Sequence, residues 1–246
     1  PPPHPPPPPP PTHTLELSSA ASDVYKRQDA DGPRRDCVTK TILCFGDSLT
    51  WGYNPSDGTR YPPEDRWPRA LESALKGRAH VIEEALNGRT IATEDFSRPC
   101  RDGLAMLPPL LEAHTPIDIV VVMLGTNDSA PCYGLTAGRI AVSSMDMVRA
   151  VITSQVGPGA TAPRMVLVAP PPLGSLNADM ALMYSGGQGT SRGLAAAYRT
   201  VANHFGITYL DAGEIVKVSS IDGVHLAPDA QRALGVAVSK LVDPLL

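Results

Sequence analysis

The sequence predicts an α/β fold, a three-layer α/β/α arrangement with a five-stranded parallel sheet between two layers of helices. Short apolar runs alternate with longer amphipathic stretches from Thr39 onward, which is typical of βαβ crossovers. The run Ile117 to Leu124 (IDIVVVML) is mostly aliphatic and carries a single charge, as expected for a strand buried on both faces. With 246 residues, 42% of them hydrophobic, the chain can bury the core of one domain.

The expected elements follow in order along the chain. We expect strands at residues 40–45, 80–86, 117–124, 164–169 and 208–210, because each is a short apolar run. We expect helices at residues 66–75, 104–114, 136–155 and within 191–204, and a last helix after Pro228, because apolar residues recur there at helical spacing. Ligands of such sheets bind beyond the carboxyl ends of the strands. The chemistry should therefore lie just after Phe45, Leu86, Leu124 and Ala169.

The first 36 residues differ in composition from the rest. Ten of the 27 prolines lie in the first eleven residues, and the segment has too little apolar surface to offset its ordering entropy. The stretch SSAASDVYKRQ at residues 18–28 is similar to translated sequencing-adapter sequence. We therefore expect residues 1–36 to be a disordered proline-rich tail or an artefact, with one globular domain over residues 37–246. A polyproline ligand for a partner domain is the alternative.

Charge and cysteine content exclude several classes of protein. Twenty-one Lys and Arg residues against 25 Asp and Glu residues give a formal net charge of -4, so we expect no nucleic-acid partner. We recognise neither an apolar run long enough to span a membrane nor an export signal, so we expect a cytoplasmic protein without membrane association. The four cysteines are too sparse for a disulfide scaffold. Cys100 and Cys132 both lie in predicted loops, and whether they pair stays open.

A serine follows the first predicted strand, in the motif GDSLTWG at residues 46–52. At the carboxyl end of the strand, Ser48 would lie near free backbone N–H groups that can face a developing anion. Serine needs a base to act as a nucleophile, and a serine in such a motif can also be a helix cap or turn residue. Among the histidines, only His225 lies in a loop three residues after a carboxylate, Asp222. One irregular turn can bring that carboxylate to Nδ1 and leave Nε2 facing the nucleophile. A loop aspartate beside a solvent-facing histidine is the alternative.

Two further motifs offer hydrogen-bond donors for an oxyanion. Asn127, in GTND at residues 125–128, follows the central strand, and an amide N–H there can point at a tetrahedral oxyanion. Gly88, in NGR at residues 87–89, follows the second strand, and glycine lets the backbone approach a ligand closely. Asn and Asp are also common in turns, so neither motif is decisive alone.

A second serine matches a different catalytic motif. Ser191 lies in GTSRG at residues 189–193, which fits the G-x-S-x-G nucleophile elbow. That elbow requires a buried strand immediately before it, whereas residues 184–188 (YSGGQ) are typical of a loop. We therefore expect Ser191 to cap the following helix.

Together the four motifs resemble the signature blocks of the SGNH/GDSL hydrolase family, and they occur in the family's order. The resemblance covers Thr39 to Leu246 and implies the flavodoxin-like SGNH hydrolase fold, with a catalytic domain over residues 37–246. The site residues that it implies are a catalytic triad of Ser48, Asp222 and His225 and oxyanion-hole donors at Ser48, Gly88 and Asn127.

Within the family, four segments are similar to bacterial arylesterases of the acyltransferase/perhydrolase subgroup: residues 42–52, the Arg66-Trp67 pair, residues 123–128 and residues 170–172. The subgroup implies short-chain esters, acyl transfer to alcohols or peroxide in competition with water, and ring-shaped homo-oligomers. Glycine at position 88 is the residue of the general family, whereas well-known acyltransferases carry a bulkier small residue there. The resemblance therefore implies hydrolysis more firmly than transfer.

The substrate pocket is expected beside the nucleophile. Asp47, Leu49 and Trp51 are its candidate residues, although Trp51 fits a core aromatic equally well. The predicted loops at residues 53–65 and 173–188 are long for such a domain and should shape the pocket or an oligomer contact.

The sequence therefore predicts an arylesterase-like serine esterase that requires no metal or organic cofactor. Its partners would be a small-molecule ester, an alcohol acceptor and further copies of itself in a homo-oligomer. One alternative is a carbohydrate acetylesterase, although only 5% of the residues are aromatic and sugar sites usually expose aromatic rings. The other is a non-catalytic flavodoxin-like binding module, which would need none of these motifs together.

Overall fold

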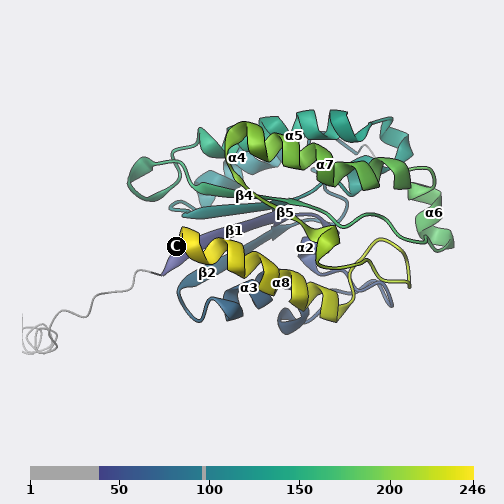
Figure 1. Ribbon diagram of the computed structural model, residues 1–246, viewed down its shortest axis with the longest axis horizontal. Helices are drawn as coiled ribbons and strands as arrows, with labels where there is room; N and C mark the ends of the chain where they lie inside the picture. Colours follow the sequence, from purple (N-terminus) through teal and green to yellow (C-terminus); the bar gives the residue numbers. More distant parts are fainter. Residues whose placement is uncertain (1–38, 96–97) are drawn as a thin grey trace, which may run out of the picture. The chain divides into compact units, whose positions relative to one another are not determined.

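The computed structural model describes residues 39–95 and 98–246 of the chain (Figure 1). Five parallel strands form one sheet in the order β2-β1-β3-β4-β5. Their bounds are β1 Lys40–Gly46, β2 Ala79–Ala85, β3 Ile119–Met123, β4 Arg164–Ala169 and β5 Thr208–Asp211. The predicted α/β class and parallel sheet are confirmed, and each strand begins and ends within two residues of its expected bounds. The tail predicted at residues 1–36 lies outside the described residues.

Helices cover both faces of the sheet, and Figure 1 shows the two layers above and below the strands. The upper layer holds α4 (Gly103–Ala113), α5 (Ala137–Ile152) and α7 (Gln188–Phe205). The lower layer holds α3 (Trp67–Ala74) and α8 (Pro228–Val242). The other α-helices in the described part of the chain are the short α2 (Ser48–Trp51) and α6 (Ala178–Tyr184).

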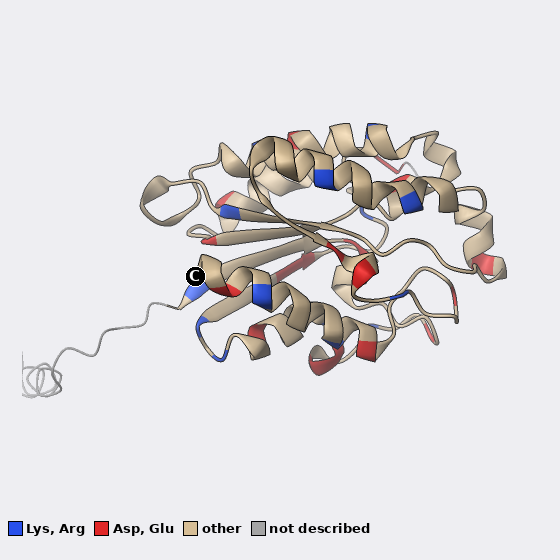
Figure 2. Ribbon diagram, viewed as in Figure 1, with Lys and Arg blue, Asp and Glu red and all other residues tan. Residues whose placement is uncertain are grey.

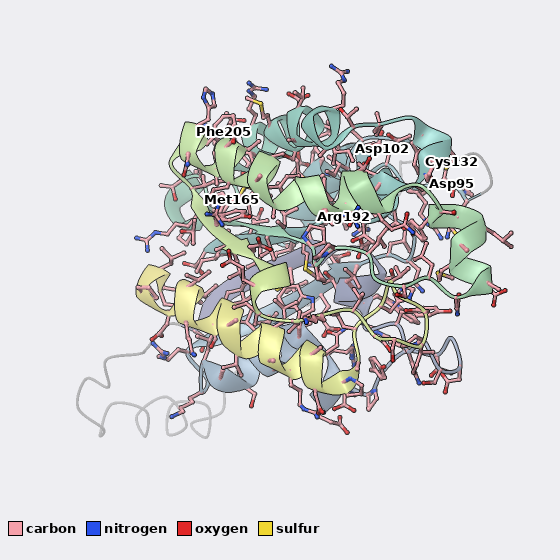
Figure 3. All side chains as sticks on the ribbon, turned by 45° about the vertical axis from the view of Figure 1, so that its right-hand side comes forward. Asp95, Asp102, Cys132, Met165, Arg192 and Phe205 are labelled. Atoms are coloured by element: carbon pink, nitrogen blue, oxygen red, sulfur yellow. The ribbon has the colours of Figure 1, made fainter. Side chains whose placement is uncertain are left out.

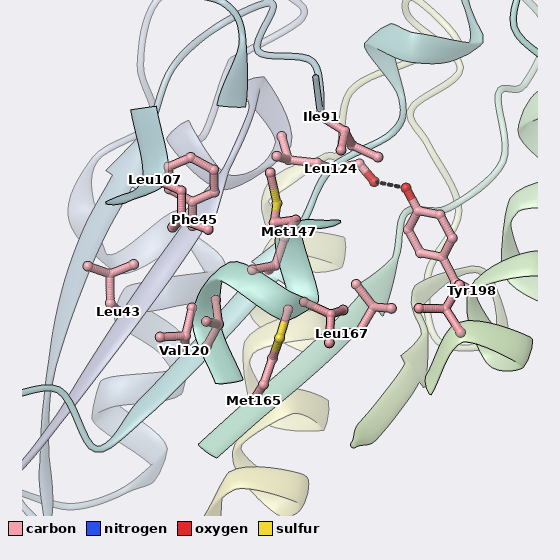
Figure 4. Packing of buried hydrophobic residues seen from close by; sticks show 14 of the residues in the cluster. Leu43, Phe45, Ile91, Leu107, Val120, Leu124, Met147, Met165, Leu167 and Tyr198 are labelled. Atoms are coloured by element: carbon pink, nitrogen blue, oxygen red, sulfur yellow. Dashed lines mark hydrogen bonds between the residues drawn. The ribbon is translucent and has the colours of Figure 1, made fainter. Parts of the chain in front are cut away.

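Alternation along the strands gives one large apolar cluster on each face of the sheet. In β1, Leu43 and Phe45 pack toward α4, α5 and α7, whereas Ile42 and Cys44 pack toward α3 and α8. Successive side chains of a strand point to opposite faces, so a strand covered on both sides must be apolar throughout. Figure 4 shows the first cluster, in which the buried Tyr198 donates its hydroxyl to the backbone oxygen of Leu124 over 3.1 Å. The core therefore extends to the carboxyl edge of the sheet.

Charged residues are interspersed over the helices and loops, with both signs present in each helical layer (Figure 2). No helix in the described part of the chain has the length and apolar character needed to cross a membrane.

Two local expectations are corrected by the structure. The predicted loop at residues 173–188 contains the helix α6. Asn177 caps the start of this helix, because its side-chain oxygen accepts the backbone N–H of Met180. Ser191 does not cap α7, because that helix begins at Gln188 after Gly187. Its hydroxyl instead accepts the backbone N–H of Leu173 over 3.0 Å. Residues 188–190 are already helical. The Ser191 hydroxyl therefore joins α7 to the segment after β4 and does not cap the helix.

Candidate active site

The carboxyl ends of β1, β2 and β3 meet at one edge of the sheet. Gly46 is in register with Ala85 of β2 and with Met123 of β3. The segments that follow these strands carry Ser48, Gly88 and Asn127, so parallel pairing brings three of the four motifs to the same edge.

Ser48 is the first residue of α2, and Asp47 caps that helix. The Asp47 side chain accepts the backbone N–H of Leu49 over 2.9 Å. The helix ends after one turn at Gly52, whose φ of 84° requires glycine. Because Asp47 is the cap, the hydroxyl of Ser48 remains available for another partner.

That partner is His225. Its Nε2 lies 3.0 Å from the hydroxyl oxygen of Ser48, and its Nδ1 lies 2.5 Å from a carboxylate oxygen of Asp222. The second carboxylate oxygen of Asp222 accepts the backbone N–H groups of Val224 and His225. Burial pushes the pKa of Asp222 upward, but the hydrogen bonds from His225 and from these N–H groups outweigh it and hold that pKa below its ordinary value. The geometry is that of a serine nucleophile with a base and an ionised group that orients the base.

The loop that carries Asp222 and His225 is braced by the segment after β4. Gly223 has a φ of 75°, and a side chain there would come within 2.3 Å of the backbone oxygen of Ser175. The carbonyl of Gly223 accepts the N–H of Gly174 over 2.8 Å, and the carbonyl of His225 accepts the N–H of Ser219 over 2.7 Å. Only glycine fits between the two segments, so this backbone contact fixes the height of the loop above the sheet.

Asn127 begins a 3₁₀ turn (Asn127–Ser129) directly beyond β3. Its amide nitrogen donates to the backbone oxygen of Arg89 over 2.9 Å and to a carboxylate oxygen of Asp47 over 3.2 Å. Its amide oxygen accepts the hydroxyl of Tyr184 over 2.8 Å. All of these groups are buried. Both amide hydrogens therefore have partners in the free protein, and the longer bond to Asp47 is the easier one to exchange for an oxyanion.

The backbone donors at this edge have no such partners. Across residues 39–95 and 98–246, the N–H groups of Ser48 and Gly88 make no hydrogen bond. Gly88 has a φ of 80°, a left-handed conformation that favours glycine. Two free N–H groups beside an amide side chain are the donor set that a tetrahedral oxyanion requires.

Tyr53 packs against the imidazole of His225, and no sequence motif marks it. Its ring centroid lies 4.1 Å from that of His225, with the planes 31° apart. The Trp51 ring lies 6.4 Å from the Tyr53 ring and packs against the guanidinium of Arg60. The sequence signal for Tyr53 was its place in the long loop at residues 53–65, which was expected to shape the pocket or an oligomer contact.

Two predicted pocket residues are interior residues instead. Asp47 is 0% exposed and Leu49 is 1% exposed, and Leu49 packs in the core cluster that contains Trp67 and Leu71. The prediction that Asp47 and Leu49 line the pocket is wrong, because the single turn of α2 directs the residues on either side of Ser48 into the protein. Asp47 still contacts the site through Asn127, and burial raises its pKa to about 7.

A cavity of about 810 Å³ opens beside Asn127. Its walls come from the segment after β2, the segment after β3 and α6, which belongs to the predicted loop at residues 173–188. The described residues that line it are Thr93, Glu94, Asp95, Arg98, Asn127, Ala130, Cys132, Tyr133, Leu182, Met183 and Tyr184. Cys100 and Cys132 are exposed free thiols and are not joined in the structure.

Comparison with known proteins agrees with this geometry. The sequence model of the GDSL-like lipase/acylhydrolase family matches residues 44–233. The chain belongs to this family. The match includes the first three motifs and the Asp222 to His225 loop, so the predicted family resemblance is confirmed.

Several relatives of this GDSL-like family member are known. An arylesterase from Vibrio mimicus is 30% identical over 146 residues, which are 58% of this chain and 62% of that protein. The chain thus aligns with less than two thirds of the length of that relative. Among solved structures, a carbohydrate acetylesterase from Sinorhizobium meliloti has a TM-score of 0.81 and 36% identity, covering 84% of this chain and 100% of that one. The inhibitor-bound aryl esterase of M. smegmatis has a TM-score of 0.81 and 37% identity over the same shares.

Proposed function

We propose that the protein is a serine esterase that hydrolyses short-chain carboxylic esters through an acyl-enzyme on Ser48. The observation that carries the proposal is the continuous hydrogen-bonded chain from Asp222 through His225 to Ser48, with distances of 2.5 Å and 3.0 Å. Membership of the GDSL-like lipase/acylhydrolase family and the similarity to two aryl esterases support it.

Acylation would begin when Nε2 of His225 takes the proton of Ser48 as its oxygen attacks the ester carbonyl. Asp222 holds the imidazole by its Nδ1–H and stabilises the imidazolium that forms. The carbonyl oxygen becomes an oxyanion, which accepts hydrogen bonds from the N–H groups of Ser48 and Gly88 and from the amide of Asn127. His225 then returns the proton to the leaving alcohol, and the acyl group remains on Ser48.

Deacylation repeats these steps with a new nucleophile. His225 removes a proton from water, which attacks the acyl-enzyme, and the acid leaves as Ser48 regains its proton. An alcohol or a peroxide in place of water would give a new ester or a peracid. Acyl transfer is therefore a proposal about the competition between nucleophiles in one mechanism.

The first experiment compares p-nitrophenyl acetate hydrolysis by the wild type and by Ser48→Ala, with and without a competing alcohol. We expect the variant to lose hydrolysis, because the hydroxyl that is hydrogen-bonded to Nε2 of His225 is that of Ser48. Activity that survives the substitution would contradict the mechanism. A new ester formed in the presence of alcohol would establish acyl transfer.

A second candidate substrate class is acetylated carbohydrate. Two similar solved structures from Sinorhizobium meliloti are a carbohydrate acetylesterase at 36% identity and a carbohydrate acetylesterase family member at 40% identity. Tyr133 and Tyr184 line the cavity beside Asn127. Rates on acetylated xylan and on phenyl acetate, measured with the same preparation, would separate the two classes. A higher kcat/KM on acetylated xylan than on phenyl acetate would make a carbohydrate ester, rather than an aryl ester, the proposed substrate.

The remaining expectations stay predictions. We propose residues 37–246 as the catalytic domain, which the family match over residues 44–233 supports. The homo-oligomer is tested by size-exclusion chromatography with light scattering. The cytoplasmic location is tested by fractionating the source cells and assaying each fraction with an antibody against the protein.

A further inference from the structure

The guanidinium group of Arg98 lies where a side chain of Gly88 would be. A Cβ atom added to Gly88 would come within 2.6 Å of Nη1 and 2.8 Å of Cζ of Arg98. Gly88 provides one of the free N–H groups at the site edge. A positive group is thus held directly beside the proposed oxyanion hole.

Hydrogen bonds to Asp95 hold the backbone N–H and the Nε of Arg98, but they do not involve the terminal nitrogens Nη1 and Nη2. Its Nε donates to a carboxylate oxygen of Asp95 over 3.0 Å, and its backbone N–H donates to the Asp95 carbonyl over 2.9 Å. The side chain is 38% exposed, and Nη1 and Nη2 have no hydrogen-bond partner among the residues that the structure describes. Two donors with fixed geometry therefore face solvent and the cavity.

Arg98 belongs to the wall of the cavity that contains Asn127. Asp95 and Cys132, which are labelled in Figure 3, line the same cavity. Burial raises the pKa of Tyr184 well above its usual range, and the positive charge of Arg98 opposes this rise. Arg98 is thus close enough to act electrostatically on the tyrosine that holds Asn127.

The cavity has an apolar wall and a polar wall. Leu182, which is 89% exposed, and Met183 line it from α6. The polar wall is formed by Arg98 and the carboxylates of Glu94 and Asp95. Two carboxylates beside one guanidinium disfavour an anionic ligand. The ligand that suits both walls is an uncharged chain with a hydrogen-bond-accepting oxygen.

We propose that Arg98 is a specificity-determining residue, whose free guanidinium N–H groups bind an uncharged oxygen in the part of the ester that enters this cavity. The enzyme would then prefer oxygen-bearing esters, such as alkoxyacyl esters or esters of alkoxy alcohols, over hydrocarbon esters of the same size. This inference rests on the proposed esterase function. Glycine at position 88 contributes because any larger residue would displace the guanidinium.

The test uses two pairs of esters in which an ether oxygen replaces one methylene group. p-Nitrophenyl methoxyacetate is paired with p-nitrophenyl butyrate, and 2-methoxyethyl acetate is paired with butyl acetate. In each pair the ratio of kcat/KM values is measured for the wild type and for Arg98→Met. Intrinsic reactivity cancels when the two ratios are compared, so only the contribution of residue 98 remains.

We expect the ratio of oxygen ester to hydrocarbon ester to fall about 10-fold in Arg98→Met for at least one pair, because a hydrogen bond from a charged donor is lost. The pair that responds shows whether the acyl or the alcohol part enters the cavity. Unchanged ratios in both pairs would overturn the proposal. Arg192→Met is the matched control, because Arg192 is exposed and lines a separate hollow on α7 with Arg199.

p-Nitrophenyl acetate separates this proposal from the esterase mechanism. Its acetyl group carries no ether oxygen for Arg98, so Arg98→Met should lose a smaller factor of kcat/KM on acetate than on methoxyacetate. An equal loss on acetate and methoxyacetate would overturn the specificity role and place Arg98 at the reacting centre. Activity of Ser48→Ala on acetate would instead mean that the mechanism itself has failed.

A second variant keeps the proposal testable if Arg98→Met does not fold. Arg98→Lys keeps the positive charge but cannot present two donors in one plane. We expect its oxygen-ester preference to fall in the same pair of esters. A wild-type ratio in that folded variant would overturn the proposal.

Discussion

The hydroxyl of Tyr184 donates a hydrogen bond to the amide oxygen of Asn127 over 2.8 Å. Tyr184 is the last residue of α6 and lies 57 positions after Asn127 in the chain. Burial raises the pKa of Tyr184 well above its usual range, so the hydroxyl keeps its proton and must act as a donor. It therefore fixes the amide with its oxygen toward α6 and its nitrogen toward Asp47, at the edge where Ser48 lies.

Removal of the Asn127 amide should reduce turnover without unfolding the protein. We expect Asn127→Ala to lower kcat by roughly 10² to 10³ fold, as for an oxyanion donor in a serine hydrolase. Steady-state hydrolysis of p-nitrophenyl acetate measures the effect. Asn203→Ala, at an exposed position of α7, is the control that should keep the wild-type kcat. An unchanged rate in Asn127→Ala would remove this residue from the oxyanion hole.

Loss of the Tyr184 hydroxyl should have a smaller effect of the same kind. Tyr184→Phe leaves Asn127 in place but frees its amide to rotate, so we expect kcat to fall roughly 2- to 10-fold with little change in KM. The double variant with Asn127→Ala should be no slower than Asn127→Ala alone, because both changes act through one amide. Tyr209→Phe is the control, because the Tyr209 hydroxyl donates to the backbone oxygen of Ala195 in α7 and not to Asn127, so its removal should not alter kcat. Additive losses in the double variant would contradict this assignment.

The buried carboxyl of Asp47 should make stability depend on pH. Burial raises its pKa in the folded protein from the ordinary 3.8 to about 7, so the folded state binds the proton more tightly than the unfolded chain. This contribution is fully present below pH 3.8 and is lost as the pH rises through 7. The wild type should therefore lose unfolding free energy relative to Asp47→Asn between pH 4 and pH 8, as measured by urea denaturation.

An exposed carboxylate provides the control for Asp47. Hydrogen bonds from Thr59 lower the pKa of Asp57 below its ordinary 3.8, so this carboxyl does not titrate near neutral pH. The difference in stability between the wild type and Asp57→Asn should then stay constant as the pH rises through 7, where Asp47 titrates. The same constancy in Asp47→Asn would show that Asp47 titrates normally.

Gln231 links α8 to the segment that carries the nucleophile. Its side chain is 0% exposed, donates to the backbone oxygen of Leu49 over 2.9 Å and accepts the N–H of Trp67 over 3.0 Å. Gln231→Leu keeps the volume but leaves both backbone groups unpaired, at a cost of about 1 to 3 kcal/mol. Chemical denaturation should show this loss, whereas Gln155→Leu, at an exposed loop position, should change stability little.

Much of the fold could be predicted from the sequence because it depends on local pattern. Apolar runs such as IVVVM in β3 are buried on both faces, and their length and flanking polar residues are visible without a structure. The helix α6 was missed because it has seven residues, Ala178–Tyr184, which is too short to show helical periodicity beside the glycines and polar residues around it. Ser191 was misassigned because the start of α7 at Gln188 carries no side-chain cap.

The candidate site also contains residues that the sequence could indicate and residues that it could not. Ser48, Asn127 and the pair Asp222 and His225 could be recognised because each chemical role needs a particular residue type in a short motif. Asp47 and Leu49 could not be placed, because one turn of helix decides which neighbours of a serine face the core. Tyr53, Arg98 and Gln231 carry no motif.

The sequence by itself determined the order of the elements, the family and the residues able to form a triad. Only the tertiary structure decided that Tyr184 orients Asn127, that Tyr53 packs on His225 and that Arg98 fills the space beside Gly88. The reason is physical. Backbone pattern and motif chemistry act over a few residues, whereas these contacts join separate segments and depend on how the layers pack against the sheet.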